Sequence, residues 1–364
     1  MSLPGDSPVM KSSMPRQLPA PARSLADVFS RSLLSFQNSS SNLQILCTAG
    51  PTEQQHHGAA PTQGDDQPAP LSPRSRPRTL IVLDSSFNPP TRAHLRMATS
   101  AIHDLTHTHG QPLGTLRLLL LLSVNNADKG VKPAAFDKRL AMMWAFARDV
   151  QHSFRGVHED EDDGQGLASV GGPPQASAGA GETPLHVDLA LAKMPYFHEK
   201  SAALAGLDFY KGTNDGAGET EQVFLAGYDT LIRIFNPKYY GPQAESATQL
   251  ASPESSPMWK ALGPFFGRAK LRVIMRTGDE WGNEEQQRAY LEGLLKAEGL
   301  GTGLVSKGLG SRIEMVDGRK AGEDVISSTL ARAAAKARDG DRLGLMVTAG
   351  VRWWIEQEDL YTEP

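Results

Sequence analysis

The chain has 364 residues, a formal net charge of −4, 21% charged residues, 35 glycines and 25 prolines. This balance gives no basic surface for nucleic acid and no acidic tail for a basic partner, and the length allows one large domain or two ordinary ones. A single cysteine, Cys47, excludes an internal disulfide and a cysteine-based zinc site, which favours a reducing setting in the cytoplasm or nucleus.

The apolar segments predict no membrane partner. The longest run, LRLLLLLSV at 116–124, is far shorter than the roughly 20 residues that cross a bilayer. Residues 1–23 lack the apolar core of a secretory signal, and Asp6 and the scattered prolines disfavour the amphipathic helix of a mitochondrial presequence. A mitochondrial location is therefore expected less than the cytoplasm or nucleus.

The N-terminal part is predicted to contain one short ordered segment between two disordered ones. Residues 1–23 are expected to be disordered, and the apolar spacing from Ser24 predicts a helix followed by a strand at 43–49, so that 24–49 is ordered. Residues 50–78 are rich in Pro, Gln and Gly and have almost nothing to bury, so they are expected to form a mobile, disordered linker.

Apolar strands and helical patterns alternate from residue 79 to residue 361, with low-complexity insertions at 156–184, 211–221 and 241–257. The strands are expected at 79–85, 115–124, 185–192, 222–228, 269–277 and 311–317, and the helices include 92–105, 135–151, 283–299 and 327–339. This alternation predicts an α/β fold: a doubly wound, Rossmann-like and mostly parallel sheet of about six strands with helices on both faces. A nucleotide should then bind at the carboxyl ends of the strands.

The first motif is DSSFNPPTRAHLRM at 84–97, where a strand gives way to a helix. If the strand ends near Asp84, the turn after it exposes backbone N–H groups, and the helix from Thr91 directs its positive dipole end to the same crevice. His94 lies on the first turn of that helix, where a ring N–H can reach a phosphate. A single histidine here is more commonly an ordinary polar residue, but the strand, turn and helix favour the functional interpretation.

SSFNPPTRAH resembles the signature of the nucleotidylyltransferase superfamily, and in particular GSFNPxTxxH of the eukaryotic, fungal-like nicotinamide and nicotinate mononucleotide adenylyltransferases. The chain departs from it at Ser85, where the family has glycine, and this affects how closely a substrate approaches the turn. The resemblance implies ATP contacts at Ser86, Phe87, Asn88, Thr91 and His94, and nicotinamide mononucleotide (NMN) contacts at Ser85, Ser86 and Phe87.

A second motif, ISSTLARAAAKAR at 326–338, resembles the ISSTxxR of the same family. Ser327 or Ser328 is expected to cap a helix, with Thr329 and Arg332 near its first turn, so that a dipole, donors and a fixed charge converge. Alone, this pattern is more commonly an ordinary helix cap. Paired with the first motif, it implies that these four residues bind the phosphates of ATP.

The stretch LAGYDTLIRIFNPKYY at 225–240 resembles a GxD segment of the family. The resemblance implies that Gly227 lets adenosine approach, that Asp229 accepts hydrogen bonds from ATP, and that Tyr240, with Tyr239 beside it, stacks on the pyridine ring of NMN. A strand end with a capped helix, and tyrosines that only pack, are the structural alternatives.

Two further segments resemble the family less specifically. VNNADKGVKP at 124–133 resembles a loop with a phosphate-contacting lysine, for which Lys129 is the first choice and Lys132 the second, although either could be a plain solvated lysine. VRWWIEQEDLY at 351–361 resembles the closing helix, with Trp353 and Trp354 as packing residues.

The resemblance implies an enzyme that transfers an adenylyl group from ATP to NMN and releases NAD and pyrophosphate. His94, Arg332 and Lys129 would be catalytic, and Mg²⁺ would bind through ATP oxygens without a metal site of the protein's own. Nicotinate mononucleotide or another phosphate-bearing acceptor is an alternative substrate. A divergent ATP-binding or ATPase member with a regulatory role is an alternative of another class, and the sequence leaves homo-oligomer formation open.

Overall fold

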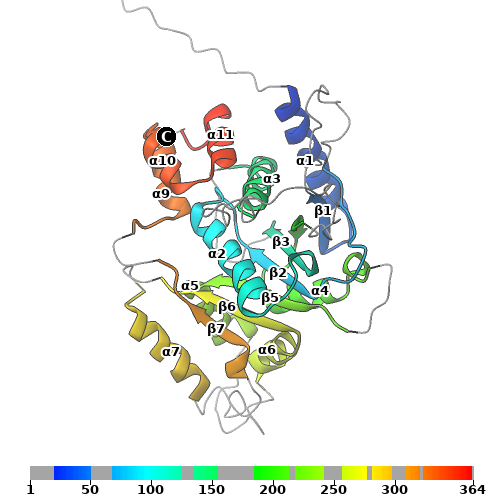
Figure 1. Cartoon of the computed structure of the whole chain (residues 1–364), viewed down its shortest axis with the longest axis vertical. Helices are drawn as coiled ribbons and strands as arrows, with labels where there is room; N and C mark the ends of the chain where they lie inside the picture. The colour runs from blue at the N-terminus through cyan, green and yellow to red at the C-terminus, as the bar shows by residue number, and fades with distance from the viewer. Residues whose placement is uncertain are drawn as a thin grey trace, which may run out of the picture.

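The computed structural model describes residues 20–50, 68–124, 134–154, 184–212, 218–241, 256–276, 281–296, 309–319 and 323–362. Its strands form one sheet in the order β1-β4-β3-β2-β5-β6-β7 (Figure 1). The strands are β1 (Leu43–Ala49), β2 (Thr79–Asp84), β3 (Leu116–Ser123), β4 (His186–Ala192), β5 (Glu221–Gly227), β6 (Ala269–Ile274) and β7 (Ile313–Val316).

The six strands β4-β3-β2-β5-β6-β7 all pair in parallel with their neighbours, whereas β1 pairs antiparallel with β4 at the edge of the sheet. The strand order reverses between β2 and β5, which is the switch point of a doubly wound fold. The predicted fold class is therefore confirmed. The sheet has seven strands instead of about six, because the strand at 43–49 belongs to this sheet and does not precede it as a separate segment.

Helices cover both faces of the sheet. They are α1 (Ala20–Asn38), α2 (Arg92–His103), α3 (Phe136–His152), α4 (Phe197–Ala205), α5 (Tyr228–Ile234), α6 (Pro257–Arg268), α7 (Glu284–Lys296), α9 (Ser328–Lys336), α10 (Gly340–Met346) and α11 (Ala349–Gln357). Figure 1 shows α2, α3 and α9 to α11 along one side of the sheet and α6 and α7 along the other.

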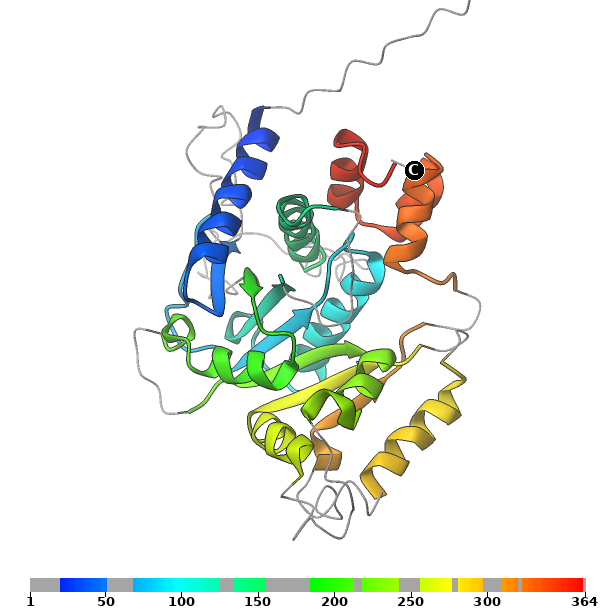
Figure 2. The ribbon, with the colours of Figure 1, turned by 180° about the vertical axis from the view of Figure 1, so that it is seen from behind.

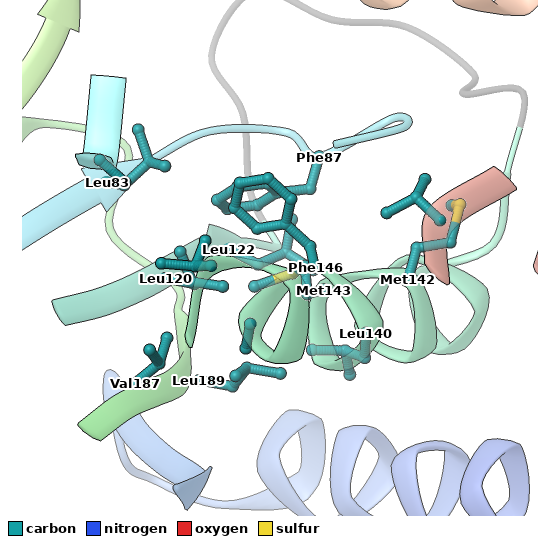
Figure 3. Close-up of a cluster of buried hydrophobic side chains, with 14 of the residues drawn as sticks. Leu83, Phe87, Leu120, Leu122, Leu140, Met142, Met143, Phe146, Val187 and Leu189 are labelled. Atoms are coloured by element: carbon teal, nitrogen blue, oxygen red, sulfur yellow. The ribbon is translucent and has the colours of Figure 1, made fainter. Parts of the chain in front are cut away.

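The pleat of β2 explains this layering, because its buried side chains alternate between the two faces. Ile81 and Leu83 join the core under α2, α3 and α11, and Leu80 and Val82 join the core under α5 and α6. Figure 3 shows α3 lying on the first of these cores, with Phe146 facing side chains of the neighbouring strands. Apolar runs without polar alternation are typical of strands covered on both faces.

The N-terminal helix begins at Ala20, inside the segment expected to be disordered, and packs on α3 beside the sheet (Figure 2). The rings of Phe29 and Trp144 lie 6.5 Å apart across this contact. None of the described helices is long and apolar enough to span a membrane.

A buried polar network lies near the amino ends of β3 and β4. Arg117 donates from Nε to Asp188 at 2.8 Å, and the same carboxylate accepts hydrogen bonds from Thr48 at 2.6 Å and from Tyr210 at 3.0 Å. Arg117 also donates to the carbonyl oxygen of Leu71. Ala69 and Leu71 belong to the expected linker, and their hydrogen bonds with Thr48 on β1 hold this part of it in place instead of leaving it free.

Candidate active site

A cleft of about 2020 Å³ opens at the carboxyl ends of β2 and β5. Ordinary ligand pockets measure roughly 300–1,000 Å³, so this cleft has room for two nucleotides. Its walls are the turn after β2, one side of α2 along its whole length, the N-terminal half of α9, the start of α5, and aromatic residues that follow β4 and α5.

The imidazole of His94 is oriented by the helix that carries it. The backbone N–H of Thr91 donates to Nδ1 at 3.0 Å, so Nδ1 is an acceptor and the proton of the neutral ring lies on Nε2. Nε2 is 2.9 Å from Oγ of Ser85 and donates to it. The ring N–H therefore points from the first turn of α2 back to the strand end, into the cleft.

The two sequence motifs are joined directly by hydrogen bonds. Arg332 donates from Nη1 to the carbonyl oxygen of Asn88 at 2.8 Å and from Nη2 to Thr329 Oγ1 at 3.1 Å. Ser328 donates to the carbonyl oxygen of Pro89 at 2.9 Å, and Ser327 caps α9 by accepting from the N–H of Leu330 at 3.2 Å. The N-termini of α2 and α9 thus face one cleft, where both helix dipoles favour an anion.

Gly227 and Asp229 form the floor of the cleft at the end of β5. A Cβ added to Gly227 would lie 2.8 Å from Oδ1 of Asp229, so this position has no room for a side chain unless Asp229 moves. Arg276, at the end of β6, lies 3.4 Å from the same carboxylate oxygen and forms an ion pair with it.

The wall opposite α9 is aromatic. Tyr240 donates its hydroxyl to the carbonyl oxygen of Ile234 at 2.5 Å, and burial raises the pKa of this hydroxyl, so the phenol stays neutral. Its ring centre lies 5.7 Å from that of His198, whose pKa is lowered by burial. Tyr239 contacts Tyr196 at 6.4 Å between ring centres. A flat aromatic ring can stack against such a surface.

Sequence reasoning missed a buried ion pair at the end of β2. Lys200, on α4, donates from Nζ to Asp84, and both side chains are almost fully buried at the edge of the cleft. Nζ also donates to the carbonyl oxygen of Pro195 at 3.3 Å. The sequence did hold one signal for Lys200. It lies in the segment that follows β4, and the carboxyl end of β4 is at the same edge of the sheet as the turn after β2.

The structure brings most of the predicted site residues into this one cleft. They are Ser85, Ser86, Asn88, Thr91, His94, Gly227, Asp229, Tyr239, Tyr240, Ser327, Ser328, Thr329 and Arg332. Phe87 is a correction, because its side chain is 0% exposed and belongs to the core (Figure 3). Because the ring is buried in the core, only the backbone of Phe87, which has a φ of 44°, can face a ligand. Lys129 and Lys132 lie outside the described residues.

Three of the acidic side chains that line the cleft form ion pairs with cations: Asp84 with Lys200, Asp229 with Arg276, and Asp104 with Arg272. Within the described ranges, no three His, Cys, Asp or Glu side chains come together as a metal site.

The chain is therefore an open, doubly wound α/β protein with a large cleft at its switch point, which is the place where sheets of this kind bind their ligands. A curated protein of Schizosaccharomyces pombe, named "Putative nicotinamide mononucleotide adenylyltransferase", is 31% identical to the chain over 220 residues, which are 60% of this chain and 62% of that protein. The chain is a homologue of this protein, so the resemblance to the nicotinamide and nicotinate mononucleotide adenylyltransferases is confirmed. The match spans less than two thirds of the relative, and no family model matches the chain.

Two solved structures were also found. "Plasmodium falciparum nicotinic acid mononucleotide adenylyltransferase complexed with NaAD" is 11% identical to this chain in sequence, with a TM-score of 0.38. The match covers 78% of this chain and 97% of the Plasmodium chain. The complex of the same Plasmodium protein with APC has 12% identity and a TM-score of 0.36, with the same coverage.

Proposed function

We propose that the chain transfers the adenylyl group of ATP to NMN and releases NAD and pyrophosphate. The observation that carries this proposal is the direct hydrogen bonding of the two motifs, Arg332 to Asn88 and Ser328 to Pro89, in one cleft that has room for two nucleotides. The homologue in S. pombe, whose name states NMN adenylyltransferase, supports the same activity.

The chemistry is an in-line displacement at phosphorus. A phosphate oxygen of NMN attacks the α-phosphorus of ATP, and the bond from that phosphorus to the oxygen bridging to the β-phosphorus breaks. Two anions must be held together while negative charge develops on the leaving pyrophosphate, so positioning and charge neutralisation carry the catalysis. Mg²⁺ enters with ATP and supplies part of the neutralising charge when bound.

His94 and Arg332 act on the phosphates. Nε2–H of His94 donates beside the N-terminus of α2, and the hydroxyl of Ser85, which accepts from Nε2, has its own proton available for a phosphate oxygen. Arg332 uses two of its five N–H groups on Asn88 and Thr329, which leaves donors and a fixed charge for the triphosphate. Lys129 is proposed to add a second fixed charge.

The other groups hold the two bases and riboses. Asp229 accepts hydrogen bonds from the adenosine, which approaches over Gly227 because that residue has no side chain. Tyr240 and Tyr239 offer the aromatic surface for the pyridine ring. Nicotinate mononucleotide carries the same ring and phosphate, and we retain it as a second acceptor.

Purified protein incubated with ATP and Mg²⁺ is expected to form NAD from NMN, with one pyrophosphate released per dinucleotide. Parallel reactions with nicotinate mononucleotide and with no acceptor, followed by chromatography of the nucleotides, identify the acceptor. ATP loss without any dinucleotide would reject adenylyl transfer and support the ATPase or regulatory alternative.

Arg332→Lys is expected to lower kcat/KM for ATP by roughly 10- to 100-fold, although the charge is kept. An ammonium cannot reproduce the fork that bonds Asn88 and Thr329 together, and a hydrogen bond to a charged group contributes about 1.5–3 kcal/mol. Steady-state kinetics with varied ATP measure the effect. Arg342→Lys, on the exposed face of α10, is the matched control, and an equal loss there would contradict the assignment.

A further inference from the structure

The segment after α11 reaches the turn of the first motif. The hydroxyl of Tyr361 donates to Oδ1 of Asn88 at 2.8 Å, across 273 positions of the sequence. Burial raises the pKa of Tyr361, with Arg139 and Arg332 acting in the opposite direction, so the phenol keeps its proton and remains a donor. Glu358, three residues earlier, forms an ion pair with Lys138 on α3 and holds this segment to the core.

Asn88 is held at both its backbone and its side chain. Its carbonyl oxygen accepts from Arg332 at 2.8 Å, and its side-chain oxygen accepts from Tyr361. Asn88 is only 6% exposed, yet it lines the cleft. With Oδ1 occupied by Tyr361, the group left over is the Nδ2 amide, which donates to no other group in the described part of the chain.

We propose that Tyr361 is a positioning residue that fixes the carboxamide of Asn88 with its NH2 group facing the phosphate-binding part of the cleft. A carboxamide has an acceptor end and a donor end of nearly the same shape, so an unanchored Asn88 can present either one. The oxygen end would repel a phosphate, whereas the NH2 end donates to it. A single phenolic hydroxyl donor on Oδ1 selects the second orientation.

This inference rests on the proposed function only in taking ATP as the phosphate ligand. The test is a double-mutant cycle in which ATP affinity and kcat/KM for ATP are measured. Tyr361→Phe is expected to weaken ATP binding and kcat/KM for ATP by about tenfold, as for the loss of one well-placed hydrogen bond. In an Asn88→Ala background the same change is expected to have less than about a twofold effect, because Tyr361 acts through Asn88.

Asn88→Asp separates orientation from folding. Aspartate has the shape of asparagine and keeps an acceptor for Tyr361, but it replaces the NH2 group with an oxygen, so ATP affinity should fall by more than about tenfold with little change in Tm. Tyr210→Phe is the matched control, because Tyr210 also donates to a side-chain oxygen, that of Asp188, far from the cleft. It is expected to lower Tm and leave kcat/KM for ATP within about twofold.

Equal losses for Tyr361→Phe in the wild-type and Asn88→Ala backgrounds would overturn the proposal, since they would indicate a general structural role. So would unchanged ATP affinity in Tyr361→Phe, or wild-type protein that binds no ATP. If the wild-type protein binds ATP but forms no dinucleotide, while Tyr361→Phe still weakens ATP binding through Asn88, the positioning role stands and the proposed transfer fails.

Discussion

His94→Ala is expected to lower kcat for dinucleotide formation by roughly 10²–10³ while the protein remains folded. The change removes the Nε2 donor at the strand end, and the loss of one such transition-state donor costs about 3 kcal/mol. It also removes the Nδ1 acceptor of the Thr91 N–H, which lowers the free energy of unfolding by about 1 kcal/mol. Steady-state kinetics and a thermal unfolding curve measure the two effects.

His152→Ala is the control for this variant, because His152 lies exposed on the last turn of α3, outside the cleft. It should retain wild-type kcat. A His94→Ala protein with wild-type activity would show that the transferred group is not held at the N-terminus of α2, and the site assignment would be wrong.

Asp188→Ala is expected to lower the free energy of unfolding by about 3–5 kcal/mol, because it leaves the guanidinium of Arg117 buried without its carboxylate. The side chains of Arg117 and Asp188 are 5% and 0% exposed, so water cannot replace the lost partner. Thr48 and Tyr210 lose their acceptor as well. Urea unfolding measures the change, and Tm should fall by about 10 °C.

The matched control is Glu284→Ala, which breaks the exposed pair between Glu284 and Arg288 on α7. An exposed pair of this kind contributes less than about 0.5 kcal/mol. Because the Asp188 network lies at the opposite ends of the strands from the cleft, Asp188→Ala should keep its kcat at a temperature where it is folded. A stability equal to wild type would contradict the role assigned to the buried pair.

The sheet could be predicted from the sequence because its strands are short apolar runs separated by helical patterns. That signal is local, and each run from TLIVL at 79–83 onward shows it. The pairing of 43–49 with β4 is not local, since an antiparallel edge strand has the same apolar pattern as a strand in another domain. The backbone of Leu71 is held beside β1 by hydrogen bonds with Arg117 and Thr48, and the composition of a Pro-rich segment does not indicate such partners.

The motif turns predicted the site for the same reason. A strand end, a turn and a capped helix are encoded within about a dozen residues, so the positions of His94 and Ser327 follow from the local sequence. The local sequence could not show whether the ring of Phe87 faces the core or the cleft, because the side chain of a turn residue at positive φ can point to either. Lys200 and Tyr361 reach the cleft only through tertiary packing, and neither has a local motif.

The hydrogen bonds between α9 and the turn after β2 also constrain how nucleotides enter and leave. Ser328 and Arg332 hold backbone carbonyls of that turn, so opening the cleft on this side would break a charge-assisted bond and a neutral one together. We therefore expect the triphosphate end of the cleft to keep its shape throughout turnover.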